Sequence, residues 1–200
     1  MSLLVKICGM TDEQTVDAAV RAGADAVGFV FAESPRRIAP QQARSISKNI
    51  SPSVLRVAVM LHPDTDEWQE VLDVFQPDVL QTDATDFDYL DVPPNIHRWP
   101  VIREGDSVDT MPSQFVYEGR SSGRGETIDW DLAAKLARRG RMILAGGLDA
   151  GNVGAALVRV RPFGVDVSSA VESAPGRKDP RKIREFINAV RTAQSGISES

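Results

Sequence analysis

Short apolar runs alternate with helical patterns from one end of the chain to the other. Residues 3–8 form the first run, and a helical pattern follows over 12–22, with Thr11 or Asp12 placed to cap its first turn and Gly23 to end it. The same alternation predicts further strands at 25–31, 54–60, 78–81, 95–102, 114–118, 141–145 and 164–167. It predicts further helices at 40–49, 64–75, 129–139, 149–160 and 179–193.

This alternation predicts an α/β fold, a single (β/α)8 barrel. Strands that are apolar on both faces and alternate with helices are typical of a parallel sheet, and eight such units favour a closed barrel. Residues 103–113 are polar and contain Gly105 and Pro112, so we expect a loop or a reduced helix after the fifth strand. A flavodoxin-like doubly wound sheet is the alternative, but it would not use all eight strands.

Length and composition indicate one globular domain. The chain has 200 residues, 42% of them hydrophobic and 26% charged, and no linker rich in proline or glycine divides it. We expect the barrel to span residues 1–194. The small polar residues at 195–200 are expected to form a disordered tail.

The net charge of the chain limits the kinds of partner it can bind, and its cysteine content limits the cellular compartment. A net charge of -5 argues against a nucleic-acid surface but permits a local positive site for a small anion. Cys8 is the one cysteine, so no internal disulfide and no oxidising compartment is implied. No apolar stretch approaches the roughly 18 residues of a membrane span, and the first nine residues lack the features of a signal peptide. We therefore expect a cytoplasmic protein without membrane or nucleic-acid partners.

Two glycine- and serine-containing segments follow the last two strands of the predicted barrel. Functional residues of this fold gather at the carboxyl ends of the strands, and the loops after strands seven and eight commonly bind phosphate. Gly146 and Gly147 follow the seventh strand, and Asp166, Ser168 and Ser169 end the eighth. Each segment alone is more often a tight turn with helix caps, but the two together favour a phosphate site.

Cys8 is a candidate for chemistry because it ends the first strand and precedes Gly9. Lys6, two residues earlier, shares its side of the strand and would favour the thiolate. A lone cysteine in an apolar strand is as often a small buried side chain. Gln81 stands at the end of the fourth strand and is a candidate for substrate binding.

Glu118 and Arg36 are the remaining candidates. Glu118 ends the sixth strand, where burial would keep it protonated and able to donate a proton, although a solvated carboxylate or a salt bridge to Arg120 or Arg124 is the commoner outcome. Arg36 or Arg37 could clamp a carboxylate, although such a pair is more often solvated. His62 and His97 show no metal-ligand spacing and no nucleotide motif is present, so we expect no metal or cofactor.

Taken together, these segments resemble phosphoribosylanthranilate isomerase of tryptophan biosynthesis. The resemblance runs in order through almost the whole chain and is highly specific in combination. The matching segments are VKICGMT (5–11), GADAVGFVF (23–31), SPRRI (34–38), RVAV (56–59), DW (129–130), LAGGL (144–148), NV (152–153), GVDVSS (164–169), VE (171–172) and PGRKD (175–179).

The resemblance implies an isomerase that needs no cofactor. Its reaction would be the Amadori rearrangement of N-(5-phosphoribosyl)anthranilate to 1-(2-carboxyphenylamino)-1-deoxyribulose 5-phosphate, by general acid–base catalysis. Cys8 would be the base, Glu118 the acid and Arg36 the anchor for the anthranilate carboxylate. The phosphate would lie against Gly147, Asp166, Ser168 and Ser169, with Gly146, Gln81 and Lys6 completing the substrate site. A monomer or a homodimer is compatible with the sequence.

Three departures from the family pattern accompany the resemblance. The family has aspartate where Glu118 stands, QLHG where residues 81–84 read QTDA, and a GGTG-like loop where residues 122–125 read SGRG. If Glu118 is not the acid, Asp83 and Asp129 are next in line. The alternatives are a histidine-pathway isomerase, which uses two aspartates and no cysteine base, and a barrel that binds such ligands without turnover.

Overall fold

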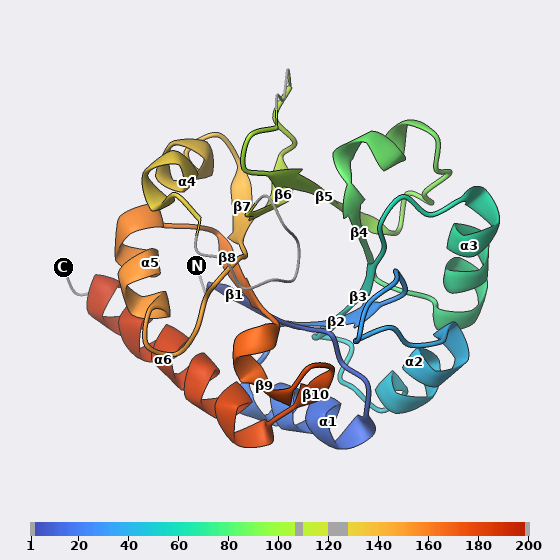
Figure 1. Cartoon of the computed structure of the whole chain (residues 1–200), viewed down its shortest axis with the longest axis horizontal. Coiled ribbons are helices and arrows are strands. Elements are labelled where there is room, and N and C mark those ends of the chain that lie inside the picture. Colours follow the sequence, from blue (N-terminus) through green and yellow to red (C-terminus); the bar gives the residue numbers. More distant parts are fainter. Residues whose placement is uncertain (1–2, 107–109, 120–127, 199–200) are drawn as a thin grey trace.

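A closed barrel of eight parallel strands forms the centre of this computed structural model, which describes residues 3–106, 110–119 and 128–198 (Figure 1). The strands follow one another in chain order, and β1 closes the barrel against β8. This confirms the predicted fold. The strands are β1 (Leu4–Cys8), β2 (Ala26–Val30), β3 (Leu55–Val59), β4 (Val79–Asp83), β5 (His97–Arg103), β6 (Gln114–Glu118), β7 (Arg141–Leu144) and β8 (Gly164–Val167).

Alternate positions along each strand divide the core into two parts. Side chains on the inner face form a compact cluster inside the barrel, and those on the outer face pack against the helices. The inner cluster comprises Ala26, Val57, Val79, Trp99, Val101, Val116, Ile143 and Ala145. Because every second residue faces inward, the residues at the strand ends that continue these rows face the mouth of the barrel.

Helices surround the barrel except beside β5 and β6, where none lies between the two strands in the described residues (Figure 1). This agrees with the reduced region expected after the fifth strand. The helical elements are α1 (Glu13–Ala22), α2 (Pro40–Ser47), α3 (Thr65–Glu70), a π-helix (Val71–Phe75), a 3-10 helix (Ala84–Asp88), α4 (Trp130–Ala137), α5 (Val153–Val160), a 3-10 helix (Ser169–Val171) and α6 (Pro180–Ser198).

The helix boundaries follow the capping residues. Asp12 accepts a hydrogen bond from the Thr15 backbone N–H at the start of α1, and Gly23 ends the helix with φ at 95°. Helix α5 begins at Val153 rather than at residue 149, because the Asp149 carboxylate accepts hydrogen bonds from the backbone N–H groups of Gly151 and Asn152 and forms a turn.

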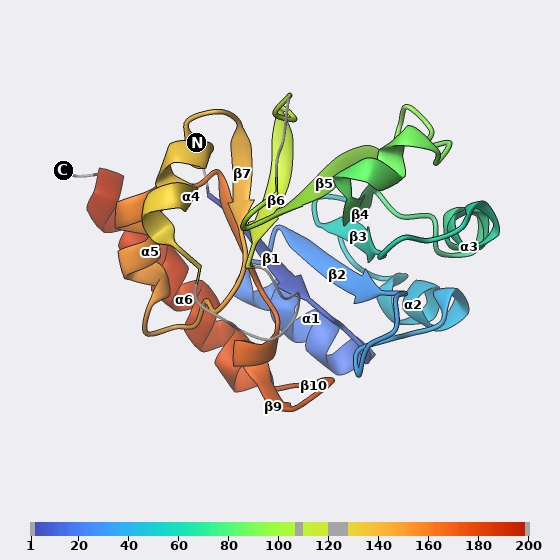
Figure 2. The ribbon, with the colours of Figure 1, turned by 45° about the horizontal axis from the view of Figure 1, so that its top comes forward.

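Two segments near the carboxyl end of the chain differ from expectation. Helix α6 continues to Ser198, so residues 195–198, expected in a disordered tail, belong to this helix. After β8 the chain adds a small antiparallel hairpin of β9 (Glu172–Ala174) and β10 (Arg177–Lys178). Figure 2 shows this hairpin at the end of the barrel toward which β1 and β8 run. No helix of the described residues is long and apolar enough to cross a membrane.

Candidate active site

A cavity of about 900 Å3 opens at the carboxyl ends of the strands. It is large enough for a small-molecule substrate, since such pockets commonly measure several hundred Å3. Nine of the ten residues predicted for the site line it; Lys6 does not. The nine are Cys8, Arg36, Gln81, Glu118, Gly146, Gly147, Asp166, Ser168 and Ser169.

The Cys8 side chain lies in the wall of this cavity and is only 8% exposed. Gly28 on β2 leaves room for it, because a Cβ atom there would lie 3.0 Å from the Cys8 Sγ. Burial raises the pKa of the Cys8 thiol, and the charge of Asp166 raises it further, whereas the cations of Lys6 and Lys178 lower it. Lys6 lowers the pKa of Cys8, as expected, but burial and the charge of Asp166 raise it by more, so Cys8 rests as a thiol.

Lys6, expected in the substrate site, lies beneath the cavity rather than in its wall. Its side chain is fully buried inside the barrel, and its Nζ lies 2.8 Å from the Asp166 Oδ2 on the neighbouring strand β8. Burial alone would lower the pKa of Lys6, but the charges of Asp166 and Cys8 outweigh it and the pKa is raised. Lys6 therefore supports Asp166 and Cys8 from below.

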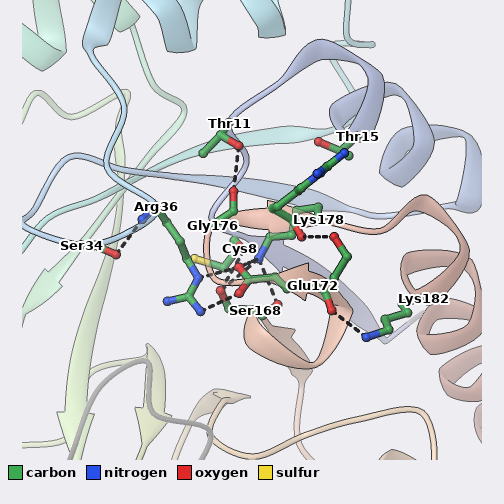
Figure 3. Close-up of polar contacts among 12 residues, drawn as sticks. Cys8, Thr11, Thr15, Ser34, Arg36, Ser168, Glu172, Gly176, Lys178 and Lys182 are labelled. Atoms are coloured by element: carbon green, nitrogen blue, oxygen red, sulfur yellow. Dashed lines mark hydrogen bonds and ion pairs between the residues drawn. The ribbon is translucent and has the colours of Figure 1, made fainter.

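Arg36 is held by Glu172, the first residue of β9 (Figure 3). Its Nε and Nη2 donate to the two carboxylate oxygens of Glu172, at 2.7 and 2.9 Å, in a two-pronged ion pair. Lys178 of β10 donates to the same carboxylate at 2.8 Å. Burial alone would raise the pKa of Glu172, but the hydrogen bonds from Arg36 and Lys178 outweigh it and the pKa is lowered.

This ion-pair cluster depends on two glycines in the left-handed region. At Gly9, with φ at 82°, a Cβ atom would lie 2.5 Å from the Arg36 Cδ. At Gly176, with φ at 76°, a Cβ atom would lie 2.3 Å from the Pro35 carbonyl oxygen. The loop that carries Arg36 therefore packs closely between the end of β1 and the β9–β10 hairpin. Arg37, by contrast, is exposed and pairs with Glu33.

The residues predicted to bind phosphate form one wall of the cavity. Gly146 and Gly147 have φ at 94° and 63°, conformations that favour glycine. The Ser168 hydroxyl donates to the Cys8 carbonyl at 3.1 Å, which ties the ends of β8 and β1 together. The backbone N–H groups of Gly147, Ser168 and Ser169 donate no hydrogen bond to any other described residue, so this wall offers donors to an anion.

Glu118 faces the same cavity from the end of β6, with its side chain 15% exposed. Its Oε1 lies 3.3 Å from the Nε of Arg103, and the Nη1 of Arg103 lies 2.6 Å from the Asp83 Oδ2. Asp129, the reserve acid, lies outside the cavity and caps α4 by accepting from the Asp131 and Leu132 backbone N–H groups. Arg120 and Arg124, weighed as partners of Glu118, lie outside the described residues.

Sequence reasoning missed three site residues. Glu172 and Lys178 belong to the segments that carry the family resemblance, but they lie in the hairpin after β8 rather than at a strand end. Arg103 fell one residue beyond the expected end of the fifth strand, whereas β5 includes it. The contacts of Glu172 with Arg36 join positions 136 residues apart, which no local pattern reveals.

The barrel and its cavity define a (β/α)8-barrel enzyme for a small anionic substrate, with a thiol and a carboxyl group facing the same space. Residues 5–189 match the family model described as N-(5'phosphoribosyl)anthranilate (PRA) isomerase. The chain belongs to this family.

Individual relatives are similar to this chain along nearly its whole length. An N-(5'-phosphoribosyl)anthranilate isomerase of Pelobacter propionicus is 38% identical over an alignment of 202 positions, which covers 96% of this chain and 97% of the relative. One of Pseudomonas fluorescens is 42% identical, covering 93% and 97%. The crystal structure of the Thermus thermophilus phosphoribosyl anthranilate isomerase has a TM-score of 0.82 and 30% identity, covering 95% and 99%.

A further solved structure contains a ligand. It is a phosphoribosyl anthranilate isomerase in complex with reduced 1-(o-carboxyphenylamino)-1-deoxyribulose 5-phosphate, with a TM-score of 0.76 and 31% identity, covering 96% of this chain and all of its own.

Proposed function

We propose that this chain catalyses the Amadori rearrangement of N-(5-phosphoribosyl)anthranilate, with Glu118 as the general acid and Cys8 as the general base. The observation that carries the assignment of roles is the common cavity. A proton donor and a thiol line the same space as the Arg36 guanidinium and the wall of glycines and serines. These are the groups that a substrate with one phosphate, one carboxylate and a ribose ring requires.

Glu118 acts first, by opening the ribose ring. Its carboxylic proton passes to the ring oxygen while the bond between C1 and that oxygen breaks and the electron pair stays on the oxygen. The nitrogen lone pair then forms a double bond to C1, which gives a protonated imine. Glu118 ends this step as a carboxylate, so a cation close to it lowers the cost of the step.

Cys8 acts second, by removing the proton from C2. The protonated imine withdraws electrons from C1, which acidifies the neighbouring C–H bond. The Cys8 thiol first releases its proton into the cavity, and the resulting thiolate takes the proton from C2. The electron pair then forms a C1–C2 double bond as the imine nitrogen becomes an amine. A proton is then added to C1 and the enol hydroxyl loses one, which gives the ketone 1-(2-carboxyphenylamino)-1-deoxyribulose 5-phosphate. Glu118 regains from the cavity the proton that the Cys8 thiol released. The sequence moves protons only, so it requires neither metal nor coenzyme.

The two ends of the substrate have separate binding groups. The phosphate lies against Gly147, Ser168 and Ser169, whose backbone N–H groups donate to it. The anthranilate carboxylate binds the edge of the Arg36 guanidinium that Glu172 does not occupy. Gln81 is buried and its Oε1 accepts no hydrogen bond from any described residue, so it can accept one from a substrate hydroxyl or amine.

The proposed setting is the cytoplasmic pathway of tryptophan biosynthesis, with the chain acting as a monomer or a homodimer. One solved structure contains monomers generated from the dimeric phosphoribosylanthranilate isomerase of Thermotoga maritima. The proposed groups among the described residues line one cavity of this chain, which supports catalysis within a single subunit.

The experiment that tests this proposal follows substrate turnover. N-(5-phosphoribosyl)anthranilate is generated in situ by a separate transferase, and its fluorescence decay is measured with the wild type, Cys8→Ala and Glu118→Gln. Loss of the acid or the base should lower kcat by about 10²–10⁴-fold. Turnover that survives Glu118→Gln would move the acid elsewhere. A wild type that binds the reduced product analogue without turning over the substrate would identify a binding barrel instead.

A further inference from the structure

Three charged side chains stand in a row at the ends of adjacent strands. Asp83 ends β4, Arg103 ends β5 and Glu118 ends β6. Arg103 is the middle member, with its Nη1 2.6 Å from the Asp83 Oδ2 and its Nε 3.3 Å from the Glu118 Oε1. All three side chains are 20% exposed or less. One guanidinium therefore bridges two carboxylates at the rim of the active-site cavity.

The backbone fixes the direction in which Arg103 points. Trp99 and Val101 belong to the cluster inside the barrel, and Arg103 continues this inward-facing row of β5. Arg103 and Glu118 are direct partners in the register between β5 and β6. The Arg103 backbone N–H also donates to the Asp106 carboxylate at 2.7 Å, which holds the turn that follows the strand.

Asp83 is also held by His62, which contacts the same carboxylate oxygen as Arg103. The Nε2 of His62 lies 3.3 Å from the Asp83 Oδ2. His62 is fixed in turn by the buried Asp86, which accepts hydrogen bonds from the His62 backbone N–H at 3.1 Å and contacts its Nδ1 at 2.9 Å. Among the described residues, Arg103 and Glu118 line the cavity and Asp83 does not, so we expect Asp83 to act on the site through Arg103.

We propose that Arg103 is a positioning residue for Glu118, and that Asp83 fixes Arg103 in the orientation this requires. The inference rests on the proposed role of Glu118 as the general acid. The guanidinium holds the Glu118 carboxyl toward the cavity, and it stabilises the negative charge that Glu118 gains as its proton moves to the ring oxygen. Arg103 therefore affects the catalytic step through Glu118. Ground-state binding of the substrate depends instead on Arg36 and on the backbone N–H groups of Gly147, Ser168 and Ser169.

The first test compares two arginines that make similar ion pairs at opposite ends of the barrel. Arg56 pairs with Asp78 across β3 and β4, with its Nε 3.1 Å from the Oδ2 of Asp78, far from the cavity residues. Arg103→Met should lower kcat about 100-fold with KM nearly unchanged, since small displacements of a catalytic group cost that much. Arg56→Met should leave both constants unchanged, and Arg103→Lys should restore part of kcat.

The second test is a double-mutant cycle between Arg103 and Glu118. If Arg103 acts through the acid, then Arg103→Met should lower kcat little further once Glu118→Gln is present. Binding of the reduced product analogue, measured by titration, should be the same in both variants and in the wild type. Asp83→Asn should lower kcat less than Arg103→Met and in the same direction.

The outcomes separate this inference from the proposed function. An active wild type together with an Arg103→Met variant as active as Arg56→Met overturns the inference alone. Fully additive losses in the cycle, or a raised KM with kcat preserved, overturn it too, because Arg103 then supports the fold or binds substrate directly. Activity that survives Glu118→Gln removes the acid on which the inference depends, while the isomerase function stands. A wild type without turnover overturns both.

Discussion

Replacing Glu172 with glutamine should destabilise the protein strongly, because its carboxylate neutralises two cations, one buried and one largely buried. The side chains of Arg36 and Lys178 are 12% and 0% exposed, and both donate to Glu172 within 2.9 Å. Breaking a buried ion pair by removing one partner costs about 3–5 kcal/mol. The glutamine side chain still accepts one hydrogen bond, so we expect the lower end, about 3 kcal/mol.

The assay is urea-induced unfolding of Glu172→Gln beside the wild type and Glu33→Gln. Glu33 also pairs with an arginine, Arg37, but the two side chains are 91% and 58% exposed. An exposed pair of this kind contributes little to stability, so Glu33→Gln should match the wild type. The midpoint of Glu172→Gln should fall with an unchanged m-value, since the folded structure and the surface exposed on unfolding stay the same.

The effect has a defined pH dependence. The folded protein lowers the pKa of Glu172, so its charge contributes stability that is present above the unfolded pKa of about 4.3 and is lost as the pH falls through the lower folded value. The difference between the wild type and Glu172→Gln should therefore stay constant above about pH 5 and shrink on further acidification. A loss below about 1 kcal/mol at neutral pH, or a difference that grows in acid, would refute the reasoning.

Three other variants probe the cavity. Lys6→Met removes a cation that lowers the pKa of Cys8. The ultraviolet absorbance of the Cys8 thiolate should therefore appear at higher pH than in the wild type. An unchanged titration would show that Lys6 does not act on the thiol. Gly28→Ala places a Cβ atom 3.0 Å from the Cys8 Sγ and should lower kcat about 100-fold, and full activity would contradict the close packing. Arg36→Lys keeps the charge but loses the two-pronged geometry, so KM should rise about tenfold or more with a smaller change in kcat; a fall in kcat at constant KM would argue against a carboxylate anchor.

The strands and the candidate site residues at their ends can be predicted from the sequence for one reason. In a parallel barrel the buried strands are apolar on both faces, so a polar residue or cysteine at a strand end stands out. Cys8 and Glu118 were found in this way, and both line the cavity. The alternation along the strand puts Lys6 on the same side as Cys8, but it does not distinguish the rim of the barrel from the layer beneath it.

Other features depend on contacts that no local pattern encodes. The apolar spacing over residues 64–75 predicts one helix, whereas the chain changes to a π-helix at Val71 and ends it with Gln76 at a φ of 55°. The hairpin that carries Glu172 and Lys178 is too short to show a strand pattern. Its position is set by packing against the loop of Arg36, where Gly176 lies against Pro35.

The structure explains how residues 81–84, which differ from the family pattern, are held in place. Thr82 and His62 both bind Asp86, so the loop after β4 is organised around a buried carboxylate. Asp83, at the place of the family histidine, is paired with Arg103 rather than left as a second acid facing the substrate. The altered loop is therefore compatible with the family reaction, provided that Arg103 is present.

The central claim, an isomerase that uses Cys8, is tested most directly by growth without tryptophan of a bacterial strain that lacks its own phosphoribosylanthranilate isomerase. Expression of the wild-type chain should restore growth, and Cys8→Ala, expressed to the same soluble level, should not. A wild-type chain that is folded and expressed yet fails to restore growth would contradict the assigned reaction. Growth restored by Cys8→Ala would contradict the role of the thiol.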